Sequence, residues 1–290
     1  MKRACRFLLT IVAIIGFVQT VVAVQAPPVA REGFAELPGV KIWYKDTGGQ
    51  GIPVIFLHAA SGSSLNWDYQ FAAFTAAGYR CIAYDRRGWG RSMTVPGGLQ
   101  PGTAADDLQN LAEYLRLDRF HLVATAAGAS VALDYALSFP QRVRSFVMAN
   151  AGVAGLEDEG YQELTRSSRA AQIDALPVYL REVGPSYRAA NPDGTRRWIA
   201  LNQMSQPNGA PAAAQKTRNR VTIASFQGLK APLLMITGDA DLLAPPPFLR
   251  YVTERVKRIQ SLIVPEAGHS TYWEQPEVFN RAVLDFIRKH

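Results

Sequence analysis

The sequence predicts an α/β protein with a mostly parallel sheet that is covered by helices on both faces. Several short runs are apolar at consecutive positions, as expected for strands that are buried on both sides. Segments with helical spacing lie between these runs, and loops of small residues follow several of them. Strands and helices that alternate in this way favour parallel strands joined by helical crossovers.

The expected strands follow one another in the order that such a sheet requires. The first apolar run covers residues 52–57 and ends in a loop of small residues. Further strands are predicted at residues 80–85, 120–124, 145–150, 232–238 and 261–265. The helical patterns between them include residues 104–115, 128–138 and 278–287. One large domain with an insertion accounts for the 290 residues of the chain.

An alanine occupies the most informative position in the sequence. The strand at residues 120–124 leads into a small-residue helix through Ala124-Thr125-Ala126-Ala127-Gly128. This segment has the form of a G-x-S-x-G elbow, in which a serine hydroxyl is exposed on a strained turn between strand and helix. Alanine replaces both the first glycine and the serine. Because Ala126 has no hydroxyl, it cannot attack a substrate as a nucleophile.

Together with four further motifs, this elbow resembles that of the α/β-hydrolase superfamily. The other motifs are the small-residue loop at 58–60, the turn at 85–92, Asp241 after a late strand, and His269 after the last strand. They occur in the order elbow, acid, histidine, and the resemblance covers the chain from about residue 39 onward. It implies an α/β-hydrolase fold with a helical cap inserted after the sixth strand.

The same resemblance implies the roles of the catalytic residues. His269 would be a general base whose orientation and tautomer are fixed by Asp241. The backbone N–H groups of Ala60 and Ala127 would form an oxyanion hole. Ala126 occupies the nucleophile position without a hydroxyl, so no acyl-enzyme can form there.

Residues 152–228 interrupt the alternation of strands and helices and correspond to the helical cap of the superfamily. The division of the chain is therefore a core at residues 27–151, a cap at 152–228, and the rest of the core at 229–290. The cap holds large side chains that would suit a small apolar ligand, although each of them could instead belong to the core of the cap. These candidate substrate-binding residues are Tyr161, Tyr179, Tyr187, Trp198 and Met204.

The N-terminal segment has the features of a secretory signal peptide. Three basic residues precede an apolar run at residues 7–24, and small residues near 23–26 offer a cleavage site. Residues 1–26 are thus predicted to direct export to the periplasm or the medium. The alternative is an uncleaved N-terminal membrane anchor. Residues 24–36 are expected to form a surface lead to the domain.

Composition limits the partners of the protein. The formal charge of +7 falls to +4 when Lys2, Arg3 and Arg6 are removed, and no basic stripe indicates nucleic-acid binding. Only Cys5 and Cys81 are present, so the exported domain forms no internal disulfide, and Cys81 is expected to be a buried apolar residue. No metal-spaced cluster or phosphate loop implies a cofactor or a metal. The expected partner is a small-molecule substrate, and the oligomeric state is not indicated.

Three functions are consistent with these residues. In the first, the protein is an exported enzyme that acts on a small apolar carbonyl compound, an ester, a lactone or a C–C bond, through the His269 and Asp241 pair. In the second, it is a serine esterase or lactonase inactivated at Ala126. In the third, it is a ligand-binding homologue that catalyses nothing.

Overall fold

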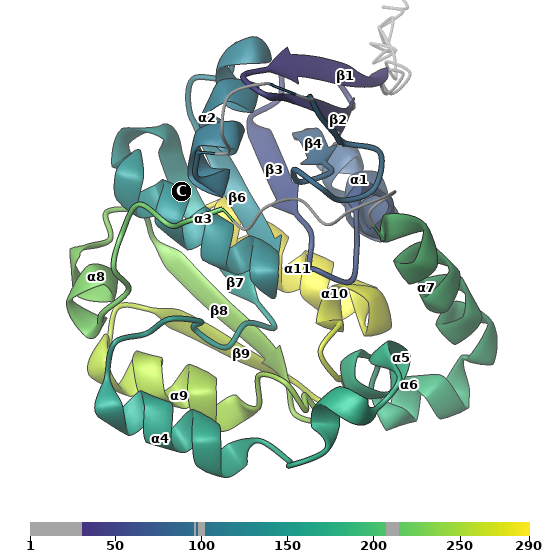
Figure 1. The fold of residues 1–290 in the computed structure, drawn as a ribbon, viewed down its shortest axis with the longest axis vertical. Helices are drawn as coiled ribbons and strands as arrows, with labels where there is room; N and C mark the ends of the chain where they lie inside the picture. The colour runs from purple at the N-terminus through teal and green to yellow at the C-terminus, as the bar shows by residue number, and fades with distance from the viewer. Residues whose placement is uncertain (1–30, 96, 98–101, 207–214) are drawn as a thin grey trace, which may run out of the picture.

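A computed structural model describes residues 31–95, 97, 102–206 and 215–290 (Figure 1). These residues form a nine-stranded sheet. Its strands are β1 (Arg31–Leu37), β2 (Val40–Asp46), β3 (Pro53–Leu57), β4 (Arg80–Tyr84), β5 (Met93–Thr94), β6 (Phe120–Thr125), β7 (Val143–Ala149), β8 (Leu233–Gly238) and β9 (Gln260–Val264). Their order is β1-β2-β4-β3-β6-β7-β8-β9, and β5 pairs with β2 at the edge.

The six predicted strands correspond to β3, β4, β6, β7, β8 and β9, and every pair among them is parallel. All six residues of β6 and of β8 are buried, as expected for central strands covered on both faces. The predicted fold class is therefore confirmed. The strand bounds differ from the expected ones by one or two residues at the ends.

The first two strands were not expected from the sequence. Residues 31–36 were expected to belong to a surface lead, but they form most of β1, which pairs with β2 in an antiparallel hairpin. The tight turn of this hairpin contains Gly39 at a φ of 69°. The prediction failed because β1 is an edge strand whose side chains are mostly exposed, so its sequence carries little apolar signal.

Helices cover both faces of the sheet (Figure 1). On one face lie α2 (Ala104–Tyr114), α3 (Ala127–Ser138) and α9 (Pro246–Arg255), whose apolar side chains share a core with those of Leu57, Leu122 and Met235. On the other face lie α1 (Asp68–Ala76), α10 (Thr271–Glu274) and α11 (Pro276–Ile287), packed with Phe56, Val123 and Ile236. Consecutive residues of one strand thus face opposite cores.

The insertion follows β7, which is the sixth strand along the chain when the two-residue β5 is left aside. It contains α4 (Glu159–Ser168), α5 (Val178–Glu182), α6 (Pro185–Ala190), α7 (Pro192–Ser205) and α8 (Ile223–Gly228). Its two ends meet where Leu156 and Val221 form an isolated β-bridge. Asn191 caps α7, and its side chain accepts a hydrogen bond from Gly194 N.

The insertion does not form one separate layer. Helix α4 lies beside α9 (Figure 1), and the Tyr161 ring packs on Phe248 and Tyr251 with centroids 5.6 and 5.4 Å apart. Helix α7 instead lies beside the loop after β3, where Ser205 donates a hydrogen bond to Ser63 over 2.9 Å. The two parts therefore approach the carboxyl edge of the sheet from different sides.

The predicted signal peptide, residues 1–26, lies outside the described residues. Within the described part of the chain, every helix is too short or too polar to cross a membrane.

Candidate active site

The elbow keeps the backbone geometry of a nucleophile turn, although it lacks the nucleophile. Ala126 lies between β6 and α3 with φ 48° and ψ −120°, a conformation that costs an L-residue about 1–3 kcal/mol. A Cβ added to Gly128 would lie 2.5 Å from the carbonyl oxygen of Leu57, so only glycine lets α3 approach β3 this closely. The turn therefore presents the side chain of residue 126 at the carboxyl edge of the sheet, where that side chain is a methyl group.

His269 and Asp241 form the predicted pair. The Nδ1 atom of His269 lies 2.8 Å from both carboxylate oxygens of Asp241, and both side chains are buried. The backbone N–H groups of Leu243 and Ala244 donate to Asp241 Oδ1 over 2.9 and 2.7 Å. These contacts fix the carboxylate, and the carboxylate fixes Nδ1 as the protonated nitrogen of the neutral ring. The Nε2 atom is then free to act as a base.

The pair is also electrostatically coupled. Burial disfavours the charged imidazole, but Asp241, together with Glu182 and Glu274, outweighs this effect and raises the pKa of His269 above its usual value. Burial alone would raise the pKa of Asp241, yet His269 and the two backbone donors hold that pKa below its usual value. At neutral pH Asp241 is thus ionised and stabilises the imidazolium that forms when His269 takes up a proton.

The loop after β3 is held in place by hydrogen bonds from the turn at residues 85–92. His58 is buried and accepts a hydrogen bond at Nε2 from Arg86 N over 2.9 Å, and its Nδ1 lies 2.6 Å from Ala59 O. Trp89 Nε1 donates to Ala60 O over 2.7 Å. These hydrogen bonds hold the loop that contains Ala60, and His58 has a structural role in it.

The second proposed oxyanion donor, Ala127, is the first residue of α3. Its N–H precedes the hydrogen-bonded turns of the helix and is available to a ligand. Because the start of α3 packs against Leu57 and His58, the N–H of Ala127 and the loop of Ala60 lie at the same edge. The oxyanion hole itself stays a prediction.

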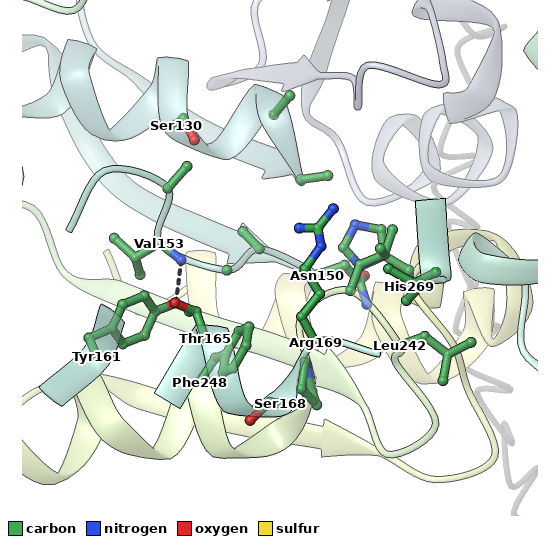
Figure 2. A pocket seen from close by; sticks show the side chains of 18 residues that line it. Ser130, Asn150, Val153, Tyr161, Thr165, Ser168, Arg169, Leu242, Phe248 and His269 are labelled. Carbon is green, nitrogen blue, oxygen red and sulfur yellow. Dashed lines mark hydrogen bonds between the residues drawn. The ribbon is translucent and has the colours of Figure 1, made fainter. Parts of the chain in front are cut away.

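A pocket of about 360 Å³ opens at this edge and is lined by Ala126, Ala127 and His269 together (Figure 2). Its size falls within the range of small-ligand sites. Apolar side chains form one part of its wall, namely Val153, Ile173, Leu242 and Phe248. The polar side chains of Ser130, Thr165, Ser168 and Arg169 also line the pocket.

Of the five predicted substrate-binding side chains, Tyr161 alone lines this pocket. Its hydroxyl accepts a hydrogen bond from Val153 N over 2.7 Å, which positions the pocket wall (Figure 2). The structure corrects the prediction for the other four. Trp198 is buried in the apolar core that α1, α10 and α11 also line, Tyr179 and Tyr187 pack against that same core, and 61% of Met204 is exposed. They lie on the α5 to α7 side of the insertion, whereas the pocket opens toward α4.

Two residues of the site were not found from the sequence. Asn150 lines the pocket next to His269 and donates to Asp241, but a single asparagine after a strand carries no distinctive signal. Arg169 follows α4 and lines the pocket while its guanidinium donates to both oxygens of Asp174, over 2.7 and 2.6 Å. Its position depends on how α4 docks, which no local pattern encodes.

No group of three or more metal-ligating side chains is present in residues 31–95, 97, 102–206 and 215–290. Cys81 is buried, and burial raises the pKa of its thiol to about 12. It is a buried apolar residue, as predicted, and lies on β4 away from the pocket lining.

A sequence profile described as the alpha/beta hydrolase family matches residues 54–282. The chain belongs to this family. The non-heme bromoperoxidase BpoC of Mycobacterium tuberculosis, so named, is 30% identical over 266 residues, which cover 83% of this chain and 96% of that protein. A 2-hydroxy-6-oxononadienedioate/2-hydroxy-6-oxononatrienedioate hydrolase of Burkholderia vietnamiensis is 27% identical over 270 residues, covering 86% of this chain and 92% of the relative.

The family fold is also seen in solved structures. A thermophilic esterase from Thermogutta terrifontis superimposes with a TM-score of 0.71 at 22% identity, covering 89% of this chain and 98% of that one. The crystal structure of BpoC gives a TM-score of 0.64 at 27% identity, with coverage of 86% and 96%. The likeness to the esterase is evidence for the fold alone. The family match is the evidence that the chain belongs to the alpha/beta hydrolases.

Proposed function

We propose that the protein is a hydrolase that attacks a small carbonyl compound directly with water, using His269 as the base. The observation that supports this most strongly is the 2.8 Å contact of His269 Nδ1 with the buried Asp241, at the wall of a pocket that Ala126 also lines. A binding protein has no need of a buried carboxylate that orients a histidine. The base and acid of a serine mechanism are thus paired, whereas the nucleophile is replaced by Ala126.

In this mechanism a water molecule beside the methyl group of Ala126 takes the place of the serine hydroxyl. His269 Nε2 removes one proton from that water while its oxygen forms a bond to the carbonyl carbon. The N–H groups of Ala60 and Ala127 stabilise the oxyanion. The tetrahedral intermediate then expels the alkoxide of an ester or lactone, or the carbanion of a C–C substrate, and this leaving group takes the proton back from His269. Water and substrate are consumed one for one, with no covalent enzyme intermediate.

The substrate class follows from the pocket and from the relatives. The pocket joins an apolar wall at Phe248, Leu242 and Ile173 to polar groups at Ser130 and Arg169. One relative is named as a 2-hydroxy-6-oxononadienedioate/2-hydroxy-6-oxononatrienedioate hydrolase, and one fold neighbour is named as an esterase. We therefore propose esters, lactones and vinylogous diketones with a small apolar body as substrates.

The test compares the protein with His269→Ala on a panel of these three substrate types. Turnover by the unaltered protein that His269→Ala lowers by about 100-fold or more supports the proposal, since general-base catalysis contributes about that much. His290→Ala, at the exposed C-terminus, is the matched control and leaves turnover unchanged. Turnover that survives His269→Ala refutes the proposed base.

The strain at Ala126 favours a second candidate, an esterase or lactonase disabled at its nucleophile. The φ of 48° serves to expose a side chain, and a methyl group gains nothing from that exposure. For this candidate, Ala126→Ser would create ester hydrolysis with a burst of product from an acyl-enzyme. If instead Ala126→Ser leaves the rate on every panel member unchanged or lower, the water mechanism is favoured. Tight ligand binding without turnover by either form would indicate a binding protein.

Export is part of the proposal and rests on the N-terminal sequence. Lys2, Arg3 and Arg6 before the apolar run at residues 7–24 support a signal peptide with cleavage near residues 23–26. Cell fractionation with N-terminal sequencing tests it. A periplasmic or secreted protein that begins near residues 24–27 supports cleavage. A membrane-bound protein that retains residue 1 favours an anchor, and a cytoplasmic protein with its first residues intact contradicts export.

A further inference from the structure

The insertion contributes a carboxylate, that of Glu182, which is not among the predicted site residues. Glu182 is the last residue of α5, and its Oε2 atom accepts a hydrogen bond from the hydroxyl of Ser61. Ser61 directly follows Ala60, so this bond connects the insertion to the loop of the proposed oxyanion hole. The loop is also held by α7, because Asn202 Nδ2 donates to Ser61 O over 2.7 Å.

The residues after Glu182 lie against the loop that carries the catalytic histidine. The backbone N–H groups of Gly184 and Gly268 both donate to Glu274 Oε2 over 2.9 Å. A Cβ added to Gly184 would lie 2.7 Å from Gly268 N, so these two segments are in direct backbone contact. Gly268 immediately precedes His269. Figure 1 shows α5 and α6 beside the segment that leads into α10.

The segment from Glu182 to Gly184 therefore contacts two loops of the core. The side chain of Glu182 reaches the loop at Ser61. The backbone of Gly184, two residues later, touches the loop at Gly268. We propose that Glu182 is a second carboxylate of the active site, which acts together with Asp241 to stabilise the imidazolium of His269 and positions the oxyanion loop through Ser61.

The charges around this segment are consistent with such a role. Burial raises the pKa of Glu182, whereas His269, Ser61 and Arg181 act to lower it and Asp241 acts to raise it. Glu182 in turn raises the pKa of His269, as do Asp241 and Glu274. Ionised Glu182 thus favours protonated His269, and protonated His269 favours ionised Glu182. The protonation of one group therefore depends on that of the other.

This role matters most in a protein without an elbow serine. Water is a weaker nucleophile than an activated serine, so the base must remove more of its proton before the bond to carbon forms. A second carboxylate raises the basicity of His269 for that step. The inference uses the proposed function only in taking His269 as the base, and its test needs no substrate.

The test is a pH titration of the histidine Cε1 resonances in protein labelled with ¹³C-histidine. The chain contains four histidines, and the His269 signal is identified by its loss in His269→Gln. In Glu182→Gln, which keeps the size and an acceptor for Ser61, the pKa of His269 falls by about one unit, as expected when a charge that favours the imidazolium is removed. Glu277→Gln removes an exposed carboxylate from α11 and leaves that pKa unchanged.

Ser61→Ala separates the two parts of the role. It keeps the carboxylate, so the pKa of His269 stays closer to that of the unaltered protein than in Glu182→Gln. If Glu182→Gln does not fold, ¹³C-glutamate labelling of the unaltered protein gives the answer, because the Glu182 carboxyl resonance then shows a second inflection at the pKa of His269. A His269 pKa that is the same in Glu182→Gln and in Glu277→Gln, or a Glu182 resonance without that inflection, overturns the inference.

The result is independent of the proposed function. A lowered His269 pKa in Glu182→Gln, with no turnover of any ester, lactone or diketone, would support Glu182 as a partner of His269 and refute the proposed hydrolase function. Turnover that depends on His269, with no effect of Glu182→Gln on its pKa, would do the opposite.

Discussion

Asn150 donates a hydrogen bond from Nδ2 to Oδ2 of Asp241 over 3.3 Å, and it does so from the residue that follows β7. The same nitrogen donates to Gly268 O over 3.1 Å, while Oδ1 accepts from Thr271 N over 3.2 Å. One buried amide thereby connects the acid loop to both sides of His269. Its φ of 46° suits asparagine better than most residues.

Asn150→Ala is expected to lower the free energy of unfolding by about 2 kcal/mol or more. The substitution leaves buried groups on Asp241, Gly268 and Thr271 with one partner fewer, and each such group costs about 1–3 kcal/mol. Urea unfolding measures the change. Asn150→Gly loses the same hydrogen bonds but relieves the backbone strain at this φ. Its free energy of unfolding should therefore lie between those of the unaltered protein and Asn150→Ala. A loss below about 0.5 kcal/mol in Asn150→Ala would mean that the amide does not hold these loops.

Turnover of any panel substrate is expected to fall as the pH is lowered through the pKa of His269. A base must be neutral to accept a proton, and Asp241 raises the pKa of His269 above 6.5. The lower midpoint of kcat/KM against pH should therefore lie above 6.5, with full activity above it. In Asp241→Asn the midpoint moves down, because the attracting charge is gone. A midpoint below 6.5 in the unaltered protein would contradict the coupling of this pair.

The sequence predicted the parts of the molecule that have strong local signals. Buried strands such as β6 are apolar throughout, and the positions of Ala126, Asp241 and His269 follow from chain order within a family pattern. The pocket wall was not predictable in this way. Whether Tyr161 or Trp198 lines the pocket depends on which side of the insertion packs over the site, and both are large, buried and helical. Glu182 and Asn150 have roles that arise only from contacts between distant segments.

Gly128→Ala is expected to be among the most damaging single substitutions in the core. Its Cβ would lie 2.5 and 2.6 Å from the carbonyl oxygens of Leu57 and His58, which belong to rigid backbone. Helix α3 or the loop after β3 must then move, at a cost of several kcal/mol and with loss of the oxyanion geometry. Thermal unfolding measures the first effect. Gly228→Ala, at the exposed end of α8 with no atom within 4 Å of the new methyl group, is the control and changes stability by less than about 1 kcal/mol. Equal melting temperatures for the two variants would refute the tight approach.

Cys81 is expected to resist thiol reagents in the folded protein, which excludes it as a replacement for the missing serine. It has no exposed surface, and burial raises the pKa of its thiol to about 12, so the reactive thiolate is scarce near neutral pH. Cys5→Ser leaves Cys81 as the single thiol of the chain. In this variant, labelling by a disulfide reagent at pH 8 should be at least about 1000-fold slower without urea than with it. Because the thiol is reached only through opening of β4, the folded-state rate should also follow the unfolding equilibrium as urea is added. Fast labelling without denaturant would mean that β4 is accessible, and a thiol mechanism would have to be tested beside that of His269.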